Sequence, residues 1–246
     1  MPKKLKSKLK SQSPLSPSVK NPKLGKTRSK NEFALALERL RKKSPSAVGF
    51  KHRWQDCKDC PLWKNRDEIV LYDAKKLPAS ILFLGEAPGK QEDATGTPFI
   101  GKSGQLLRQM ISQLKVDLSK SPTWAIANSV CCLPITDDDE LRPPTIEEQT
   151  ACFPRLIEFI QLCQPQLVVL LGESAKRIWK KSGLNKAGFN FTDQTPIPSL
   201  ELRHPAYLLR NGASSSRTFS ENYNGVVDFK RDYLKLRDAS KLLASR

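Results

Sequence analysis

The chain has 246 residues, with 42 Lys or Arg against 25 Asp or Glu, so its formal net charge is +17. A positive charge of this size favours a polyanionic partner, most simply a nucleic acid. No apolar run approaches the length of a membrane span, and the first residues lack the apolar core of a secretory signal. The sequence therefore predicts neither a membrane protein nor a secreted one.

The positive charge is concentrated at the amino terminus. Residues 1–31 carry ten Lys or Arg and no acid, which leaves +7 of the seventeen net charges for the rest of the chain. Their composition predicts a disordered, solvated tail. It also fits an organelle transit peptide, although Lys outnumbers Arg and the prolines would break an amphipathic helix. We otherwise expect a cytoplasmic monomer, associated with the nucleoid if the source is bacterial.

A short amphipathic helix is predicted over residues 32–43, where Phe33, Leu37 and Leu40 recur at helical spacing. Ser44-Pro45-Ser46 ends this pattern. We therefore expect a short helix and linker over residues 32–50, followed by one domain over residues 51–246.

Strands and helices alternate along that domain. Apolar runs predict strands at residues 80–85, 124–130, 167–172 and 197–202. Helices are predicted at residues 103–115, 145–162, 174–181 and 226–243, and Thr145 with Glu148 makes a capping-box start for the second of these. This alternation predicts an α/β fold of three layers (α/β/α), with helices on both faces of a central, mostly parallel four-stranded sheet.

A loop rich in glycine and carboxylates follows the first predicted strand. It reads LGEAPGKQED over residues 84–93 and continues as GTPFIGKSGQLL over residues 96–107. Open α/β sheets bind ligands at the carboxyl ends of their strands, so we expect a ligand site here. Asn128 is a further candidate, because it ends the second predicted strand at a position where an apolar residue would be expected.

Six cysteines are present, and the first two form the pair Cys57-Lys58-Asp59-Cys60. By itself a C-x-x-C pair fits zinc, a redox pair or an iron–sulfur cluster. Disulfides are not expected in a chain without a secretory signal. We expect Cys163 to be a small buried hydrophobic residue.

Together these motifs resemble the uracil-DNA glycosylase superfamily, and in particular its iron–sulfur branch, family 4. The likeness covers about residues 54–235 and keeps the family's order: the C-x-x-C with Pro61-Leu62, the glycine-rich loop, Asn128, and HPAYLLR over residues 204–210. The resemblance implies hydrolysis of the N-glycosidic bond of uracil in DNA, which starts base-excision repair.

The resemblance also implies a 4Fe–4S cluster held by Cys57, Cys60, Cys132 and Cys152. As in the family, Cys132 stands four residues after Asn128. Four thiolates are the usual requirement for such a cluster, and zinc is the alternative because four cysteines also suit it. Cys131 is a neighbouring thiol that could be confused with the ligand Cys132.

Roles for the other site residues follow from the same resemblance. The implied catalytic residues are Glu86, Asn128 and His204, and the implied substrate-binding residues are Gly85, Ala87, Glu92, Phe99, Gly101 and Ser103. An excised base must be flipped out, stacked and read at its edge. Phe99 would stack on the uracil, Asn128 would pair with its O4/N3 edge, and His204 would donate to O2. Without the resemblance, a core Phe, a turn-capping Asn and solvated loop carboxylates fit equally.

The chain departs from the family in the loop after Asn128. Leu133 follows the third cysteine where the family has Arg, and Leu141 stands where it has Asn, beside Arg142. The acidic run 137–140 would repel DNA if it faces the bound strand. These departures favour an alternative function, an iron–sulfur DNA-binding protein of the same fold with weak or no catalysis.

Deleting residues 1–31 tests the role of the tail. Its ten cations should contact phosphates, so the deletion should weaken DNA binding at low salt and flatten the dependence of log K on log salt by about 0.9 per lost contact. The single-turnover excision rate at saturating enzyme should not change. An unchanged salt slope would contradict DNA contact by the tail and favour the transit-peptide alternative.

Overall fold

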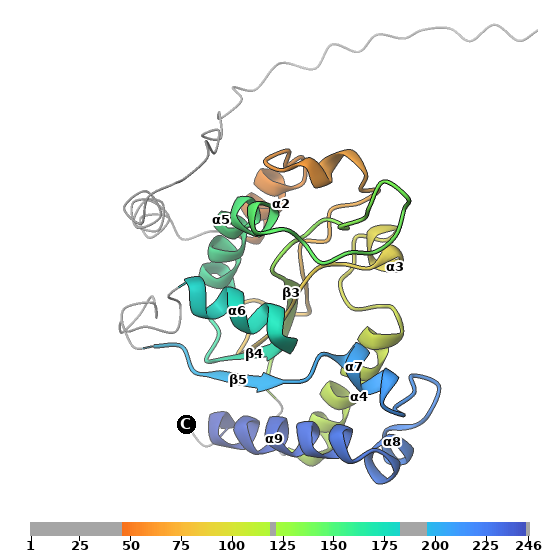
Figure 1. The fold of residues 1–246 in the computed structure, drawn as a ribbon. Coiled ribbons are helices and arrows are strands. Elements are labelled where there is room, and N and C mark those ends of the chain that lie inside the picture. Colours follow the sequence, from red (N-terminus) through yellow and green to blue (C-terminus); the bar gives the residue numbers. More distant parts are fainter. Residues whose placement is uncertain (1–45, 119–121, 183–195, 245–246) are drawn as a thin grey trace, which may run out of the picture.

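The computed structural model describes residues 46–118, 122–182 and 196–244 (Figure 1). The tail predicted over residues 1–31 and the helix predicted over residues 32–43 lie outside the described residues. None of the helices within the described ranges is long and apolar enough to cross a membrane.

The centre of the fold is a mostly parallel sheet with strand order β1-β3-β2-β4-β5. Its strands are β1 (Asp73–Ala74), β2 (Ile81–Gly85), β3 (Trp124–Asn128), β4 (Leu167–Leu171) and β5 (Ser199–Leu202). The last four match the predicted strands, which run parallel to one another. The prediction of four strands was wrong by one, because β1 adds an antiparallel edge next to β3. A strand of two residues is too short to show the alternation of side chains by which a strand is predicted from sequence.

Nine helices flank this sheet in the described ranges. They are α2 (Ala47–Trp54), the 3-10 helix η1 (Pro61–Lys64), α3 (Lys90–Asp93), α4 (Lys102–Asp117), α5 (Ile146–Cys163), α6 (Gly172–Ser182), α7 (Pro205–Arg210), α8 (Phe219–Gly225) and α9 (Val227–Ala244). The four predicted helices correspond to α4, α5, α6 and α9. The predicted capping box of α5 is confirmed, since Thr145 Oγ1 accepts from Glu148 N and Glu148 Oε2 accepts from Thr145 N.

Two hydrophobic clusters, one on each face of the sheet, produce the predicted three layers. Along β2 the side chains alternate, with Leu82 and Leu84 in one cluster and Ile81 and Phe83 in the other. The first cluster packs against α2, α5 and α6, and the second against α4, α7 and α9 (Figure 1). All of β2 is buried, as expected for a central parallel strand covered on both faces.

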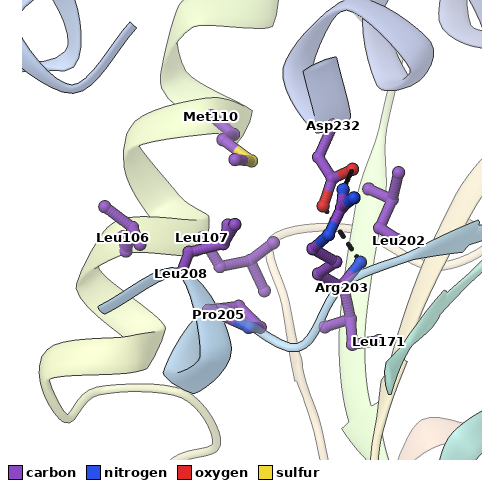
Figure 2. Close-up of a pocket in the computed structure, with 9 residues that line it drawn as sticks. All are labelled: Leu106, Leu107, Met110, Leu171, Leu202, Arg203, Pro205, Leu208 and Asp232. Carbon is purple, nitrogen blue, oxygen red and sulfur yellow. Dashed lines mark hydrogen bonds and ion pairs between the residues drawn. The ribbon is translucent and has the colours of Figure 1, made fainter. Parts of the chain in front are cut away.

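An ion pair joins the end of β5 to α9. Asp232 is 1% exposed and accepts hydrogen bonds from Arg203 N at 3.0 Å and from Arg203 Nη1 at 2.8 Å (Figure 2). A small apolar cavity lined by Leu107, Met110 and Leu208 lies beside the pair. The pair therefore holds the backbone that leads directly into His204.

The first described helix, α2, starts inside the segment that we expected to be a linker. Phe50 is fully buried, and its ring contacts those of Tyr72 and Phe159 at centroid distances of 5.7 and 5.6 Å. Trp54 Nε1 donates to the buried Glu158 Oε2 at 2.9 Å. Phe50 and Trp54 thus pack against α5 as part of the core.

Replacing Phe50 with Ala should lower the free energy of unfolding by about 3–5 kcal/mol, because it empties a fully buried aromatic site. Urea denaturation of the purified protein measures this change. Val48→Ala is the matched control: Val48 lies on the same helix and is 80% exposed, so its loss should stay within about 0.5 kcal/mol. Equal effects of the two substitutions would show that α2 is not part of the folded core.

Candidate active site

The candidate site lies where the carboxyl ends of β2, β3 and β5 meet. The register pairs Gly85 with Asn128, so the glycine-rich loop and the end of β3 start side by side. The loops beyond these strands enclose a cleft of about 270 Å³. Seven predicted site residues line it: Glu86, Ala87, Glu92, Phe99, Ser103, Asn128 and His204. Gly85 and Gly101 are not among the lining residues, but each lies against one that is.

Gly85 is required by close packing at the floor of the cleft. A side-chain carbon at this position would collide with the amide oxygen of Asn128 and with the ring of Phe99. The absence of a side chain at Gly85 therefore lets the two functional side chains approach the strand and each other.

Phe99 has a strained backbone that its neighbours hold in place. Its φ is +56°, in the left-handed region that non-glycine residues seldom adopt. Its carbonyl accepts from Arg108 Nε at 2.9 Å, and a side chain at Gly104 would collide with its backbone. The ring is 6% exposed, and its centroid lies 6.1 Å from that of His204. Such strain is expected where a ring must face a binding cleft.

Asn128 places an unpaired acceptor in the cleft wall. The residue is 1% exposed, and its Oδ1 has no hydrogen-bond partner among the described residues. Its backbone carbonyl accepts from Arg155 Nη2 at 2.7 Å, which fixes the end of β3. Buried polar atoms are normally hydrogen-bonded, so this free oxygen is available to accept from a group that enters the cleft.

His204 caps α7 and presents its other ring nitrogen. Its Nδ1 accepts from Ala206 N at 3.2 Å, so the neutral ring carries its proton on Nε2. Burial lowers the pKa of His204 from its usual value, with Glu86 opposing and Arg210 assisting this shift. The residue is therefore a neutral N–H donor near pH 7.

The two loop carboxylates differ in their surroundings. Glu86 lines the cleft, and its carboxylate makes no hydrogen bond or ion pair within the described residues. Glu92 is 8% exposed, and its carboxylate accepts from the backbone N–H groups of Gly89, Ile100 and Gly101 at 2.8–3.1 Å. Glu92 thus joins the two halves of the glycine-rich loop, an arrangement that supports loop positioning more than the predicted contact with substrate.

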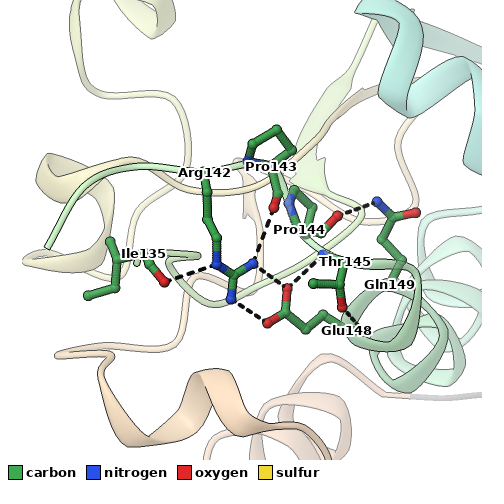
Figure 3. Close-up of polar contacts among 7 residues, drawn as sticks. All are labelled: Ile135, Arg142, Pro143, Pro144, Thr145, Glu148 and Gln149. Atoms are coloured by element: carbon green, nitrogen blue, oxygen red, sulfur yellow. Dashed lines mark hydrogen bonds and ion pairs between the residues drawn. The ribbon is translucent and has the colours of Figure 1, made fainter. Parts of the chain in front are cut away.

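The loop after β3, in which the chain departs from the family, forms a wall of the cleft. Leu141 and Arg142 line it, together with Pro134, Pro143 and Pro144. The Arg142 guanidinium donates to both carboxylate oxygens of Glu148, at 2.8 and 2.6 Å (Figure 3). This contact lowers the pKa of Glu148. Leu141 and Arg142 were not predicted as site residues; the signal in the sequence was that this loop departs from the family there.

Four predicted metal ligands, Cys57, Cys60, Cys132 and Cys152, line a second, small cavity, and Cys131 lines it too. Cys131 Sγ lies 3.4 Å from Cys152 Sγ and 3.9 Å from Cys132 Sγ. Among the described residues, no group of three His, Cys, Asp or Glu side chains has an arrangement that could hold a metal ion. Cys163 lies elsewhere in the core, and its thiol donates to Ala79 O at 3.8 Å, as expected for a buried structural cysteine.

Two arginines reach the cysteine cavity. Arg66 Nη1 donates to Cys132 Sγ at 3.3 Å, and Arg155 Nη2 lies 3.6 Å from Cys152 Sγ. Hydrogen bonds from Cys131 lower the pKa values of Cys132 and Cys152, against the opposing effect of burial, and the neighbouring arginine assists each shift. Burial raises the pKa of Cys57 to about 12 and that of Cys60 to about 11.

The family and several relatives are identified by comparison with known proteins. Residues 73–227 match the model of the uracil DNA glycosylase superfamily. A type-4 uracil-DNA glycosylase of Thermotoga maritima is 35% identical over 172 residues, which span 67% of this chain and 84% of that protein. Similarly named proteins of Sulfurisphaera tokodaii and Saccharolobus solfataricus are 40% and 36% identical over 52% of this chain and 56% of each relative. The chain thus belongs to the uracil-DNA glycosylase superfamily.

Proposed function

We propose that this protein is a type-4 uracil-DNA glycosylase, which hydrolyses the N-glycosidic bond of uracil in DNA and leaves an abasic site. The observation that supports this most directly is the unpaired Oδ1 of Asn128, buried in a cleft beside Phe99 and His204. Uracil carries an N3–H donor next to its O4 acceptor, and an amide side chain carries the complementary pair.

Substrate binding would begin with extrusion of the uridine from the DNA stack. The Phe99 ring would cover one face of the base, and Asn128, which packs closely on Gly85, would read its edge. Because the Asn128 backbone is held by Arg155 and the Phe99 backbone by Arg108, both contacts are preorganised. The cleft of about 270 Å³ has room for a single extruded base.

Bond cleavage moves the N1–C1′ electron pair onto the leaving base. His204 Nε2–H would donate to uracil O2, where negative charge develops, and the neutral ring suits this role because an N–H donor is sufficient. Glu86 would orient a water molecule for attack on C1′ and accept its proton. Ser103, near the amino terminus of α4, would contact the DNA next to the flipped nucleotide.

The residues around the cysteine cavity support the implied 4Fe–4S cluster. Arg155 is fully buried, and its Nε and Nη1 have no hydrogen-bond partner among the described residues. A buried cation needs nearby negative charge, which thiolates supply. Cys57, Cys60, Cys132 and Cys152 would hold the cluster, which would serve to tie the segment before β1 to the β3–α5 loop. Zinc on the same four thiolates is the alternative, and Cys131 would remain a neighbouring thiol.

A second candidate function is a DNA-binding protein of the same fold with weak or no catalysis. The observation that favours it is the acidic loop: Asp137, Asp138 and Glu140 are exposed on the segment that forms one wall of the cleft. These carboxylates would repel DNA phosphates. An intact protein that binds DNA and does not release uracil would establish this function in place of the first.

For the partners, we propose uracil-containing DNA and a monomeric enzyme. For its location, we propose the cytoplasm, at the nucleoid in a bacterial source, with an organelle as the alternative. The net charge of +17 supports the DNA partner.

Replacing Asn128 or His204 with Ala should reduce single-turnover excision of uracil by roughly 10²–10³-fold, because each removes one preorganised polar contact to the base. Binding of DNA that lacks uracil should not change. The parent should release uracil and not thymine from the same oligonucleotide. If both variants excise uracil at the parental rate, the proposed site is wrong.

Anaerobically purified protein should be brown and contain about four iron atoms per chain. Cys132→Ser should lose the visible absorption and lower the thermal midpoint, because the cross-link between the two segments is lost. Cys131→Ser and Cys163→Ser are matched controls that should keep both. Colourless protein with stoichiometric zinc would contradict the cluster, and loss of iron in Cys131→Ser would contradict the assignment of Cys132 as the ligand.

A further inference from the structure

One arginine beside the cleft binds two consecutive carbonyls of the glycine-rich loop. Arg108 Nε donates to Phe99 O at 2.9 Å, and Arg108 Nη2 donates to Pro98 O at 3.0 Å. The same Nη2 lies 2.7 Å from Asp73 Oδ2, in an ion pair whose side chains are 31% and 28% exposed. Neither member of the pair lines the cleft. The pair therefore reaches the site through the backbone that carries Phe99.

We propose that Asp73 and Arg108 are positioning residues, which hold the Phe99 ring where it stacks on the extruded uracil. The inference rests on the proposed function. Phe99 needs such support because its φ of +56° is unfavourable for a residue with a large side chain, and a backbone in this region persists only where its surroundings hold it. Without the support, we expect the backbone to relax and the ring to leave the stacking position.

One face of α4 supplies two parts of this support. Gly104 and Arg108 are four residues apart, so they lie on the same face of the helix. A side-chain carbon at Gly104 would collide with the carbonyl group of Phe99, so the helix packs directly against the strained peptide. One turn further along, the Arg108 guanidinium binds the carbonyl oxygens. The helix thus both contacts the strained backbone and binds it through hydrogen bonds.

Asp73 fixes the orientation of the guanidinium. It lies on the edge strand β1, whose register pairs it with Ile126 of β3. Its carboxylate accepts a charge-assisted hydrogen bond from Arg108, and the guanidinium also lies over the Trp124 ring, 5.8 Å from the ring centroid. A planar guanidinium can donate to several acceptors at once, whereas a lysine ammonium is a point charge on a flexible chain. The edge strand thus contributes to the site by bringing the carboxylate to the arginine.

The location of these contacts favours positioning over a contribution to stability. A partly exposed ion pair contributes little to the stability of a fold. Three non-glycine residues have a positive φ in the described ranges, and Phe99 is the one among them that lines the cleft. Arg108 binds the carbonyl of this residue and that of the residue before it. The hydrogen bonds are therefore concentrated on the one strained peptide whose side chain would contact the base.

The test is a double-mutant cycle of single-turnover uracil excision. Arg108→Met should reduce the rate by roughly 10²-fold, because a small displacement of a positioned group can cost this much. Arg108→Lys keeps the charge but should not restore the rate. In the Phe99→Ala background, Arg108→Met should cause no further loss, because the arginine acts through Phe99. Arg237→Met is the matched control and should match the parent, because Arg237 is 29% exposed and pairs with Asp238 on α9.

Equal losses from Arg108→Met in both backgrounds would overturn the proposal, because the arginine would then act on the whole fold. A parental rate in Arg108→Met or in Arg108→Lys would overturn it as well. Asp73→Asn is the second variant if Arg108→Met does not fold. It should lower the rate in the parent and have no effect in the Phe99→Ala background, and any other result would contradict its positioning role.

A fluorine label gives a readout that does not need excision. With para-fluorophenylalanine in place of Phe99, the fluorine resonance should shift or broaden in Arg108→Met and Asp73→Asn but not in Arg237→Met. The same label in place of Phe50, which belongs to the hydrophobic cluster on the other face of the sheet, should keep its resonance in all three variants. An unchanged resonance at Phe99 would overturn the proposal. Failure of the proposed function would appear separately, as a parent that releases no uracil, and the fluorine comparison would still decide whether the pair positions the ring.

Discussion

The parallel pairing of β2 with β3 is the interaction on which the site depends. It sets Gly85 opposite Asn128, and the missing side chain at Gly85 leaves just enough space for the Asn128 amide and the Phe99 ring. A shift of one residue in this register would turn Asn128 to the other face of the sheet. The buried apolar side chains of β2 and β3, which fill both hydrophobic clusters, therefore also determine where the base-reading groups lie.

Arg155 connects this site to the cysteine cavity. It extends from α5, donates to the carbonyls of Asn128 and Ser129, and also reaches Cys152. A fully buried guanidinium is costly unless its surroundings supply negative charge. The proposed cluster would supply it, and its structural contribution would therefore extend to the backbone that carries Asn128.

The features that could be predicted from the sequence were those with a local pattern. Apolar runs located the four parallel strands, and Thr145 with Glu148 located the start of α5. Most of the candidate site was also found, because its residues follow strand ends in recognisable motifs. Seven of them indeed line one cleft.

What could not be predicted depends on distant contacts. β1 is formed only by pairing with β3, and Phe50 becomes part of the core only by packing on Phe159. In the sequence Glu92 resembles a free loop carboxylate. Its backbone donors Ile100 and Gly101 are not its neighbours in sequence, and only the folded loop brings them to it. The cleft-facing position of Leu141 likewise depends on its loop being tied to Lys90 and Glu148.

The account is tested most directly by single-turnover uracil excision with Gly85→Ala. Gly225→Ala is the control, because a side chain at Gly225 would meet no atom within 4 Å. We predict that Gly85→Ala remains folded by circular dichroism and loses about 10²-fold or more in rate, because the new methyl group displaces Asn128 and Phe99. The Gly225→Ala variant should match the parent. Parental activity in folded Gly85→Ala protein would contradict the claim that this contact builds the uracil site.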